Sequence, residues 1–190
     1  MKRAYIAVAM AGLVVAACGG AGSGAASSAP VAVATTAAPT PTPTIANTFV
    51  FTADLSPKDV VPPITDAEAS GSGTATVTIS LAKDSTGKTI GANAKIEVSL
   101  KGFPATTKIV ALLAHKGAAG ANGAGVINAG ITADTAVALT GGSATITKDN
   151  LTMKPEDATD LIANPSGYYV LAHSQVHASG VARGQLKAKS

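Results

Sequence analysis

Three histidines are the side chains of this sequence best suited to hold a metal ion. His115, His173 and His177 are all the histidines in the chain, and imidazole nitrogen is a common ligand of zinc and copper. On a helix, the four-residue spacing of His173 and His177 would let both bind one ion. The local pattern instead indicates a strand followed by a turn, and along a continuous strand the two would lie roughly 13 Å apart. A shared ion therefore requires a bend at Ser174 or Gln175, or a meeting of His115 with His173 across strands.

A structural role is the alternative for these residues. In that interpretation His173 is a half-buried, hydrogen-bonded strand residue and His177 is an exposed loop residue. The sequence offers two or three imidazoles and no carboxylate motif beside them, which is a small ligand set for zinc. We therefore expect no bound cofactor, with a copper or zinc site at His115, His173 and His177 as the alternative.

Arg183 invites a second functional interpretation. It is the one arginine beyond the first three residues, and lysine supplies the remaining positive side chains there. A guanidinium offers five donors in a planar fork, which suits a fixed position with several contacts. It could bind an anion or a partner, or it could clamp backbone carbonyls or a carboxylate such as Asp54 across a sheet. Because Gly180 and Gly184 flank it as backbone-packing positions would, we expect a structural clamp, with Gln185 as its second member.

Other chemical motifs are sparse. The sequence contains no Gly-x-Ser-x-Gly, phosphate-binding loop, HExxH or CxxC pattern, each of which would indicate a particular reaction. Two groups of acidic residues could attract calcium, but we expect them to be solvated charges in a loop and at a helix start. These groups are Asp66 with Glu68, and Glu156 and Asp157 with Asp160. We therefore expect no catalysis.

Most of the chain from residue 48 onward predicts β-strands. In residues 75–81 and 94–100, apolar and polar residues alternate, which is typical of strands with one buried face. Residues 109–113 form a continuous apolar run and predict a strand buried on both faces. Further strands are expected at residues 49–55, 144–147, 168–174 and 181–186, with glycine-rich loops at 116–125 and 140–142.

A single short helix is expected within residues 154–165. Pro155 suits a first helical turn, the two acidic residues after it favour the positive end of the helix dipole, and Pro165 prevents continuation. Leu161 and Ile162 can attach this helix to a sheet, together with Leu151. Several short strands, glycine turns and one helix predict an all-β fold, an antiparallel Greek-key β-sandwich with one short helix.

The N-terminus predicts export and a membrane anchor. Lys2 and Arg3 precede an apolar run, residues 4–17, that is too short for an ordinary membrane-spanning helix. Small residues then lead directly into Cys18, the only cysteine, in a pattern that resembles the lipobox of bacterial lipoproteins. The resemblance implies cleavage of a signal peptide, residues 1–17, and attachment of diacylglycerol to Cys18. An ordinary secretory signal with a leftover thiol is the alternative.

Residues 18–47 predict a tether rather than a domain. They are mostly Gly, Ala, Ser, Thr, Pro and Val without a charged residue, so they cannot bury enough apolar surface to offset the entropy of ordering. The folded domain is expected at residues 48–190. Removal of Lys2 and Arg3 lowers the number of basic residues from 14 to 12 against 11 acidic ones. This near-neutral balance gives no reason to expect a nucleic-acid partner.

The domain resembles the chordin-type (CHRD) domain family. The resemblance rests on residues 51–56, 61–64 and 69–71 near its start, on the glycine-rich loop 117–123, and on a closing signature. That signature consists of Asn164-Pro165, Tyr168-Tyr169-Val170, His173, Gly180 and Arg183-Gly184-Gln185-Leu186. The family often has His-x-His before the glycine loop, whereas this chain has Leu113-Ala114-His115 and keeps only the second histidine.

The resemblance implies an immunoglobulin-like or superoxide-dismutase-like sandwich used as an extracellular module, and it implies no settled reaction. With the anchor and the tether, it leads us to expect a bacterial lipoprotein held on the cell membrane and facing outward. Its expected contacts are the membrane and an extracellular protein or envelope component, made through the loops at 116–125 and 175–179. The alternative is a copper- or zinc-binding redox protein of superoxide-dismutase type.

Overall fold

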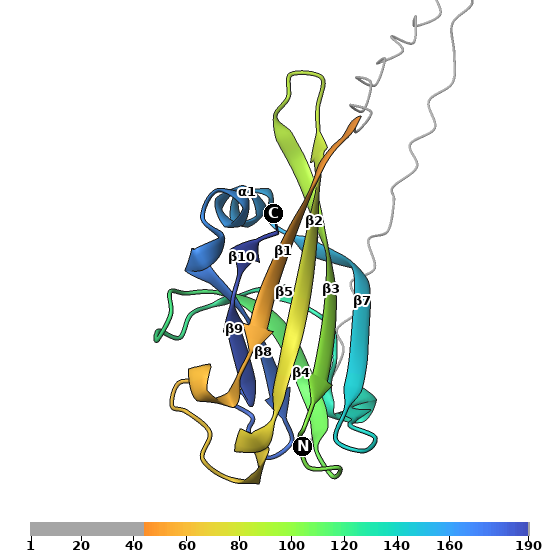
Figure 1. The fold of residues 1–190 in the computed structure, drawn as a ribbon. Helices are drawn as coiled ribbons and strands as arrows, with labels where there is room; N and C mark the ends of the chain where they lie inside the picture. Colours follow the sequence, from red (N-terminus) through yellow and green to blue (C-terminus); the bar gives the residue numbers. More distant parts are fainter. Residues whose placement is uncertain (1–43, 190) are drawn as a thin grey trace, which may run out of the picture. The chain divides into compact units, whose positions relative to one another are not determined.

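The strands form two sheets that pack face to face (Figure 1). Apolar side chains of both sheets fill the space between them. This computed structural model describes residues 44–189. Cys18, the expected signal peptide and the expected tether up to residue 43 lie outside the described residues. Strand β1 (Thr44–Leu55) begins before residue 48, where we expected the domain to start. No helix within the described residues is long and apolar enough to cross a membrane.

The first sheet has the strand order β10-β1-β2-β3-β7, and every neighbouring pair is antiparallel. Its other strands are β2 (Ser72–Lys83), β3 (Thr89–Lys101), β7 (Ala144–Met153) and β10 (Lys187–Ala188). The short strand β10 pairs with β1 only at Phe51 and Thr52. One edge of this sheet is therefore a two-residue strand and the other is β7.

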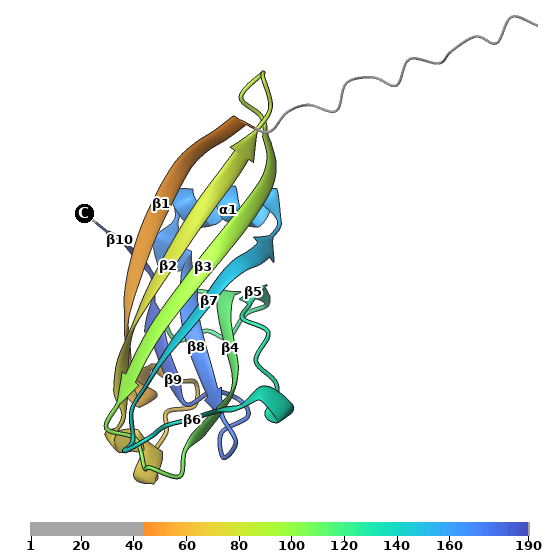
Figure 2. The ribbon, with the colours of Figure 1, turned by 90° about the vertical axis from the view of Figure 1, so that its right-hand side faces the viewer.

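The second sheet has the order β5-β4-β8-β9, with β6 paired to β4. Its strands are β4 (Lys108–Lys116), β5 (Gly125–Asn128), β6 (Val137–Ala138), β8 (Tyr168–Ser174) and β9 (Ala182–Gln185). The chain changes sheet between β3 and β4, before β7, before β8 and again before β10. Figure 2 shows β8, β9 and β4 behind the layer of β1, β2, β3 and β7. The fold is the all-β antiparallel sandwich predicted from the sequence.

The core lies between the two layers. Val77 and Ile79 of β2 and Ile96 and Val98 of β3 are completely buried. From the opposite sheet, Leu112 and other apolar residues of β4 and β8 pack into the same cluster. Burial of each such side chain contributes about 1.5–3 kcal/mol, so the alternation in β2 and β3 supplies much of the driving force for folding.

The only α-helix of the described residues, α1 (Pro155–Ala163), begins with proline as predicted and ends before Asn164. Leu161 is fully buried, and Leu151 and Ile162 pack partly against the same core. The predicted attachment of this helix to the sandwich is thus confirmed.

Strand β4 differs from the prediction. It continues to Lys116 rather than ending near residue 113, and Val110, Ala111 and Leu113 are only partly buried. One face of β4 belongs to the core, whereas the other lies under loops, which explains a continuous apolar run on a strand with unequal faces. The prediction also missed β5, β6 and β10.

Candidate functional site

The outer face of the second sheet is covered by loops, and the candidate site residues gather there. In β8, Val170 and Ala172 point into the main core. Tyr169 and Leu171 point the other way and form a separate apolar cluster with Val60. Residues 57–64, the covering segment, thus pack over this face. Side chains on the outward face of this sheet are therefore shielded from water by the loops. Their polar groups form hydrogen bonds with these loops instead of with water.

Arg183 on β9 is buried under this cover, with 2% of its surface exposed. Its Nη2 donates to the carbonyl oxygens of Ala118 and Ala121, at 2.8 Å each. Its guanidinium carbon lies 3.6 Å from the ring centroid of Tyr169, a cation–π arrangement. The side chain therefore reaches backbone carbonyls, one of the two expected kinds of partner. Asp54, the carboxylate suggested from the sequence, instead contacts Lys187 at 3.5 Å.

The glycine-rich loop, residues 117–124, is held by three further side chains. Nε2 of Gln185 donates to the carbonyl oxygens of Gly117 and Ser166, at 2.7 Å each. The hydroxyl of Tyr169 accepts a hydrogen bond from the N–H of Gly123. Nδ2 of Asn122 donates to a carbonyl of the covering segment. A loop with little apolar surface of its own is thus fixed by an acceptor from β8 and donors from β9, and Arg183 and Gln185 act on the same loop.

Gly184 explains why a glycine stands beside Arg183. A Cβ atom at this position would overlap the backbone carbonyl of Asp54 in β1. Strands β1 and β9 approach closely here, and Ser56 and Arg183 exchange two backbone hydrogen bonds, at 2.8 and 3.1 Å. The backbone-packing role expected for this glycine is the one it has. The two sheets are joined at this point.

His115 and His173 meet on the same covered face. His115 stands at the end of β4 and His173 near the end of β8, and their ring centroids are 6.1 Å apart. Tyr169, opposite His115 across the strands, stacks on its ring at 5.0 Å with an interplanar angle of 5°. Strand β4 shifts register between Ile109 and Ala111. The two histidines thus come from neighbouring strands, as the sequence allowed.

Each of these imidazoles uses one nitrogen and leaves the other without a partner. Nδ1 of His115 lies 3.0 Å from the carbonyl oxygen of Gly123, and Nδ1 of His173 lies 2.9 Å from that of Ala178. Both Nε2 atoms are buried and have no hydrogen-bond partner among the described residues. Burial lowers the pKa of both histidines, which favours neutral rings.

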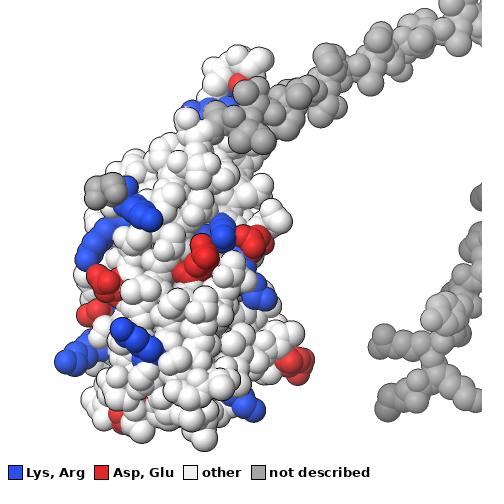
Figure 3. Space-filling view, turned by 45° about the vertical axis from the view of Figure 1, so that its right-hand side comes forward, with Lys and Arg blue, Asp and Glu red and all other residues white. Residues whose placement is uncertain are grey.

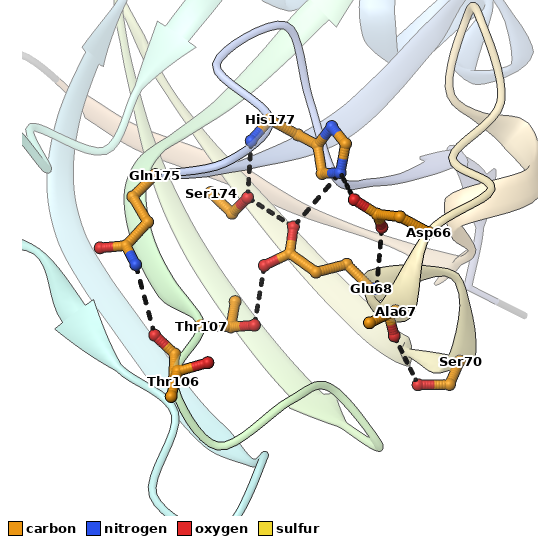
Figure 4. Close-up of polar contacts among 9 residues, drawn as sticks. All are labelled: Asp66, Ala67, Glu68, Ser70, Thr106, Thr107, Ser174, Gln175 and His177. Atoms are coloured by element: carbon orange, nitrogen blue, oxygen red, sulfur yellow. Dashed lines mark hydrogen bonds and ion pairs between the residues drawn. The ribbon is translucent and has the colours of Figure 1, made fainter.

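His177 belongs to a different cluster, shown in Figure 4. Its Nε2 lies 2.8 Å from Oδ2 of Asp66 and 3.7 Å from Oε2 of Glu68. Glu68 is 4% exposed and accepts hydrogen bonds from the hydroxyls of Thr107 and Ser174, at 2.7 Å each. Ser174 in turn accepts from the N–H of His177. This network ties the 3-10 helix η2 (Ala67–Ser70) to the end of β8.

This cluster corrects two expectations. Glu68 is a buried, fully engaged carboxylate rather than a solvated loop charge, and His177 is partly buried and hydrogen-bonded to Asp66 rather than exposed. The strand ends at Ser174, so a turn, not a continued strand, carries His177. Among the described residues, no three or more His, Cys, Asp or Glu side chains gather where they could hold a metal ion. The three histidines therefore divide into a pair and a single residue.

Asp160 of α1 contacts two polar side chains of the second sheet. It accepts a hydrogen bond from the hydroxyl of Tyr168 and pairs with Lys116 at 2.7 Å. The side-chain hydrogen bond from Lys116 lowers the pKa of Asp160, and Tyr168 adds to this effect. A carboxyl with a lowered folded-state pKa contributes stability above its ordinary pKa and loses it as the pH falls through the lowered value.

We therefore expect Asp160→Asn to flatten the fall in stability below about pH 4. Lys116→Met should have the same effect, because either change removes the ion pair. Urea midpoints measured between pH 5 and pH 2.5 check this prediction. The pair is exposed, so the change in slope should be small, and identical slopes in all three proteins would contradict it.

Comparison with known proteins adds one finding. Residues 51–186 match the sequence profile of a family described as the CHRD domain. No curated protein and no solved structure matches the chain. The match includes the covering segment, the glycine-rich loop, both strands that carry the histidine pair, and Arg183 with Gln185.

Proposed function

Because the chain belongs to the CHRD domain family, we propose that it is a bacterial lipoprotein that displays this domain outside the cell as a binding module. Cys18 carries the lipid, the residues between it and β1 form a spacer, and the sandwich faces away from the membrane. The domain binds a protein or another component of the envelope or its surroundings, and it performs no catalysis. Nucleic acid is not its ligand.

The observation that carries the proposal is the bracing of the glycine-rich loop. The backbone of this loop is hydrogen-bonded by the side chains of Arg183, Gln185 and Tyr169. A loop that is already ordered pays less entropy when it binds, which favours recognition. Binding residues often lie on loops that a rigid scaffold positions. The polar residues of the closing signature thus hold the glycine-rich loop in a fixed shape that a partner can bind.

The braced loop forms one wall of a hollow of about 470 Å³, a volume within the range of ligand-binding clefts. The hollow lies between this loop, the segment 57–63 and the start of β10. It is lined by charges of both signs and by apolar residues, among them Asp59, Lys58, Lys187, Val60 and Pro63. A lining with charges of both signs beside apolar residues suits a peptide-like or polar partner better than a polyanion.

The charge distribution on the rest of the surface also argues against a polyanionic partner such as nucleic acid. On the face drawn in Figure 3, acidic and basic side chains are interspersed, and Lys95 lies near both Glu97 and Asp149. Nucleic-acid binding draws on a basic patch or stripe. The loop 175–179 adds an apolar contact, because Val176 is 61% exposed.

Anchoring is tested by the substitution Cys18→Ser. We expect the native protein to sediment with membranes and the variant to appear in the soluble extracytoplasmic fraction, because two acyl chains hold a protein stably while none leaves it free. Mass spectrometry of the mature N-terminus should show a diacylglyceryl group on Cys18. An unmodified thiol on protein recovered from cells would contradict the anchor.

Binding is tested by cross-linking from the native surface. A photoreactive amino acid at position 119, in the exposed part of the braced loop, should give a discrete cross-linked product. The same group at position 99, exposed on the opposite sheet, is the matched control and should give none. Equal labelling from both positions, or none from either, would contradict a binding surface at the hollow.

A further inference from the structure

The histidine pair has a protonation pattern that its hydrogen bonds fix. A carbonyl oxygen only accepts, so Nδ1 of His115 and Nδ1 of His173 must each carry the hydrogen that they donate. In a neutral imidazole the other nitrogen, Nε2, is then a bare lone pair. Both Nε2 atoms are buried and lack a partner among residues 44–189. Leaving a buried acceptor unsatisfied is costly, and the structure does so twice in one place.

Metal-binding histidines use this same arrangement. When one nitrogen binds an ion, the other usually donates to a carbonyl, a carboxylate or water, which fixes the tautomer and the ring orientation. In this protein the carbonyls of Gly123 and Ala178 take that role, and the stacked ring of Tyr169 further restrains His115. The lone pairs of His115 and His173 are therefore held ready.

The separation of the rings suits a single shared ion. Nitrogen–metal distances of about 2.0–2.1 Å place the centroids of two imidazoles on one ion roughly 5–6.5 Å apart, depending on the angle at the metal. The observed separation is 6.1 Å, toward the open end of that range. An angle this wide departs from the tetrahedral angle of structural zinc, and with only two protein ligands it fits a nearly linear, two-coordinate ion.

Charge and ligand number narrow the choice of ion. No third His, Cys, Asp or Glu joins the pair within the part of the chain that the structure describes, whereas zinc sites use at least three protein ligands. The guanidinium of Arg183 and the ring of His115 both pack on the ring of Tyr169, and the positive charge of the guanidinium disfavours a divalent cation nearby. A monovalent cuprous ion is satisfied by two imidazoles and adds a single charge.

We propose that His115 and His173 bind one monovalent copper ion between their Nε2 nitrogens. His177 takes no part, because its Nε2 is paired with Asp66. The site lies beneath the braced loop and the turn after β8, so these elements both order the ligands and restrict access. This inference goes beyond anchoring and display, and it holds whether or not the hollow binds a partner.

The test uses the full chain with Cys18→Ser, so that no thiol competes for the metal. Cuprous copper is titrated under anaerobic conditions against a chromophoric chelator. We expect one high-affinity ion per chain, and at least a 100-fold loss of affinity in His115→Asn and in His173→Asn. His177→Asn is the matched control and should keep the parent affinity. Titration with zinc should give much weaker binding than copper.

A second measurement needs no variant at the site. In the chain with 15N-labelled histidine, silver(I) serves as a probe of the same charge that does not change its oxidation state. We expect the Nε2 signals of two histidines to shift and that of the third to stay, with His177→Asn removing the unshifted signal. Absence of copper binding, unchanged affinity in either His115→Asn or His173→Asn, or stoichiometric zinc of equal strength would each overturn the proposal.

Discussion

Arg183→Lys should lower the melting temperature of the domain by about 5–10 °C. Lysine keeps the charge but has no planar guanidinium to lie over the ring of Tyr169 while it donates to the carbonyls of Ala118 and Ala121, as Nη2 does at 2.8 Å each. We therefore expect one of these two hydrogen bonds to be lost. Hydrogen bonds to charged groups contribute about 1.5–3 kcal/mol each. In a domain of this size, each kcal/mol corresponds to about 2–4 °C.

The loop should loosen more than the rest of the domain. Arg183 is fully enclosed, so a lysine there leaves part of its desolvation uncompensated. We expect faster amide hydrogen exchange at residues 117–124 in Arg183→Lys, with the core strands β2 and β3 changed only by the global loss of stability. This readout separates a clamp on the loop from a general packing defect.

The matched control exchanges one cation for the other at an exposed site. Lys187 has a side chain that is 70% exposed, and Lys187→Arg should leave the melt within about 1 °C, because surface substitutions change stability little. A melting temperature of Arg183→Lys within error of the parent protein would contradict the clamp.

Glu68→Ala should destabilise the domain by about 3 kcal/mol, since the substitution leaves two buried hydroxyls without their acceptor. The carboxylate joins Thr107 and Ser174, which are 2% and 0% exposed. It also lies 3.7 Å from His177, so its loss removes a nearby negative charge from that imidazole. Equilibrium unfolding in urea measures the change.

A double-mutant cycle shows whether the contacts or the cavity cause the effect. Glu68→Ala and Ser174→Ala should be non-additive by more than about 1 kcal/mol if the hydroxyl and the carboxylate stabilise each other. Glu97→Ala, which removes a half-exposed glutamate from β3, is the control and should cost little. Additive single effects, or a loss below about 0.5 kcal/mol for Glu68→Ala, would show that this network does not brace the fold.

The sequence predicted the strands whose two faces differ most clearly. Residues 75–81 and 94–100 lie within β2 and β3, where one face is core and the other is in water, so alternation is strong. It failed for β5, β6 and β10, which are two to four residues long and owe their conformation to the strand beside them. Such short segments carry no period of their own.

The candidate site was harder to predict, for a reason that its residues show. Arg183 stood out as a lone arginine, but its partners are carbonyls of two alanines, and every residue has a carbonyl. Glu68 lies in a predicted loop, where the sequence favours a solvated charge. Its partners, Thr107 and Ser174, lie 39 and 106 residues away in the sequence. No local pattern reports such contacts.

The histidine pair shows a similar limit. The sequence allows His115 and His173 to meet across neighbouring strands, but a one-residue change of register would send one ring to the opposite face. The unbroken register from Ala111 opposite His173 to His115 opposite Tyr169 puts both rings on one face, and the apolar run 109–113 does not report this pairing. The four-residue spacing between His173 and His177 separates two clusters, because His173 lies beside His115 and His177 beside Asp66.

The two edges of the first sheet bear on how neighbouring copies meet. An unpaired strand edge exposes N–H and C=O groups that can form hydrogen bonds with a strand of another chain, which leads to aggregation. Here β10 shields part of β1 and is followed by exposed lysine, while β7 carries Lys148 and Asp149 and is interrupted by Asn150 with φ of 54°. Lipid anchors, as proposed, would concentrate many copies on one surface. A short paired edge strand on one side and a charged, irregular edge strand on the other disfavour strand pairing between neighbouring copies.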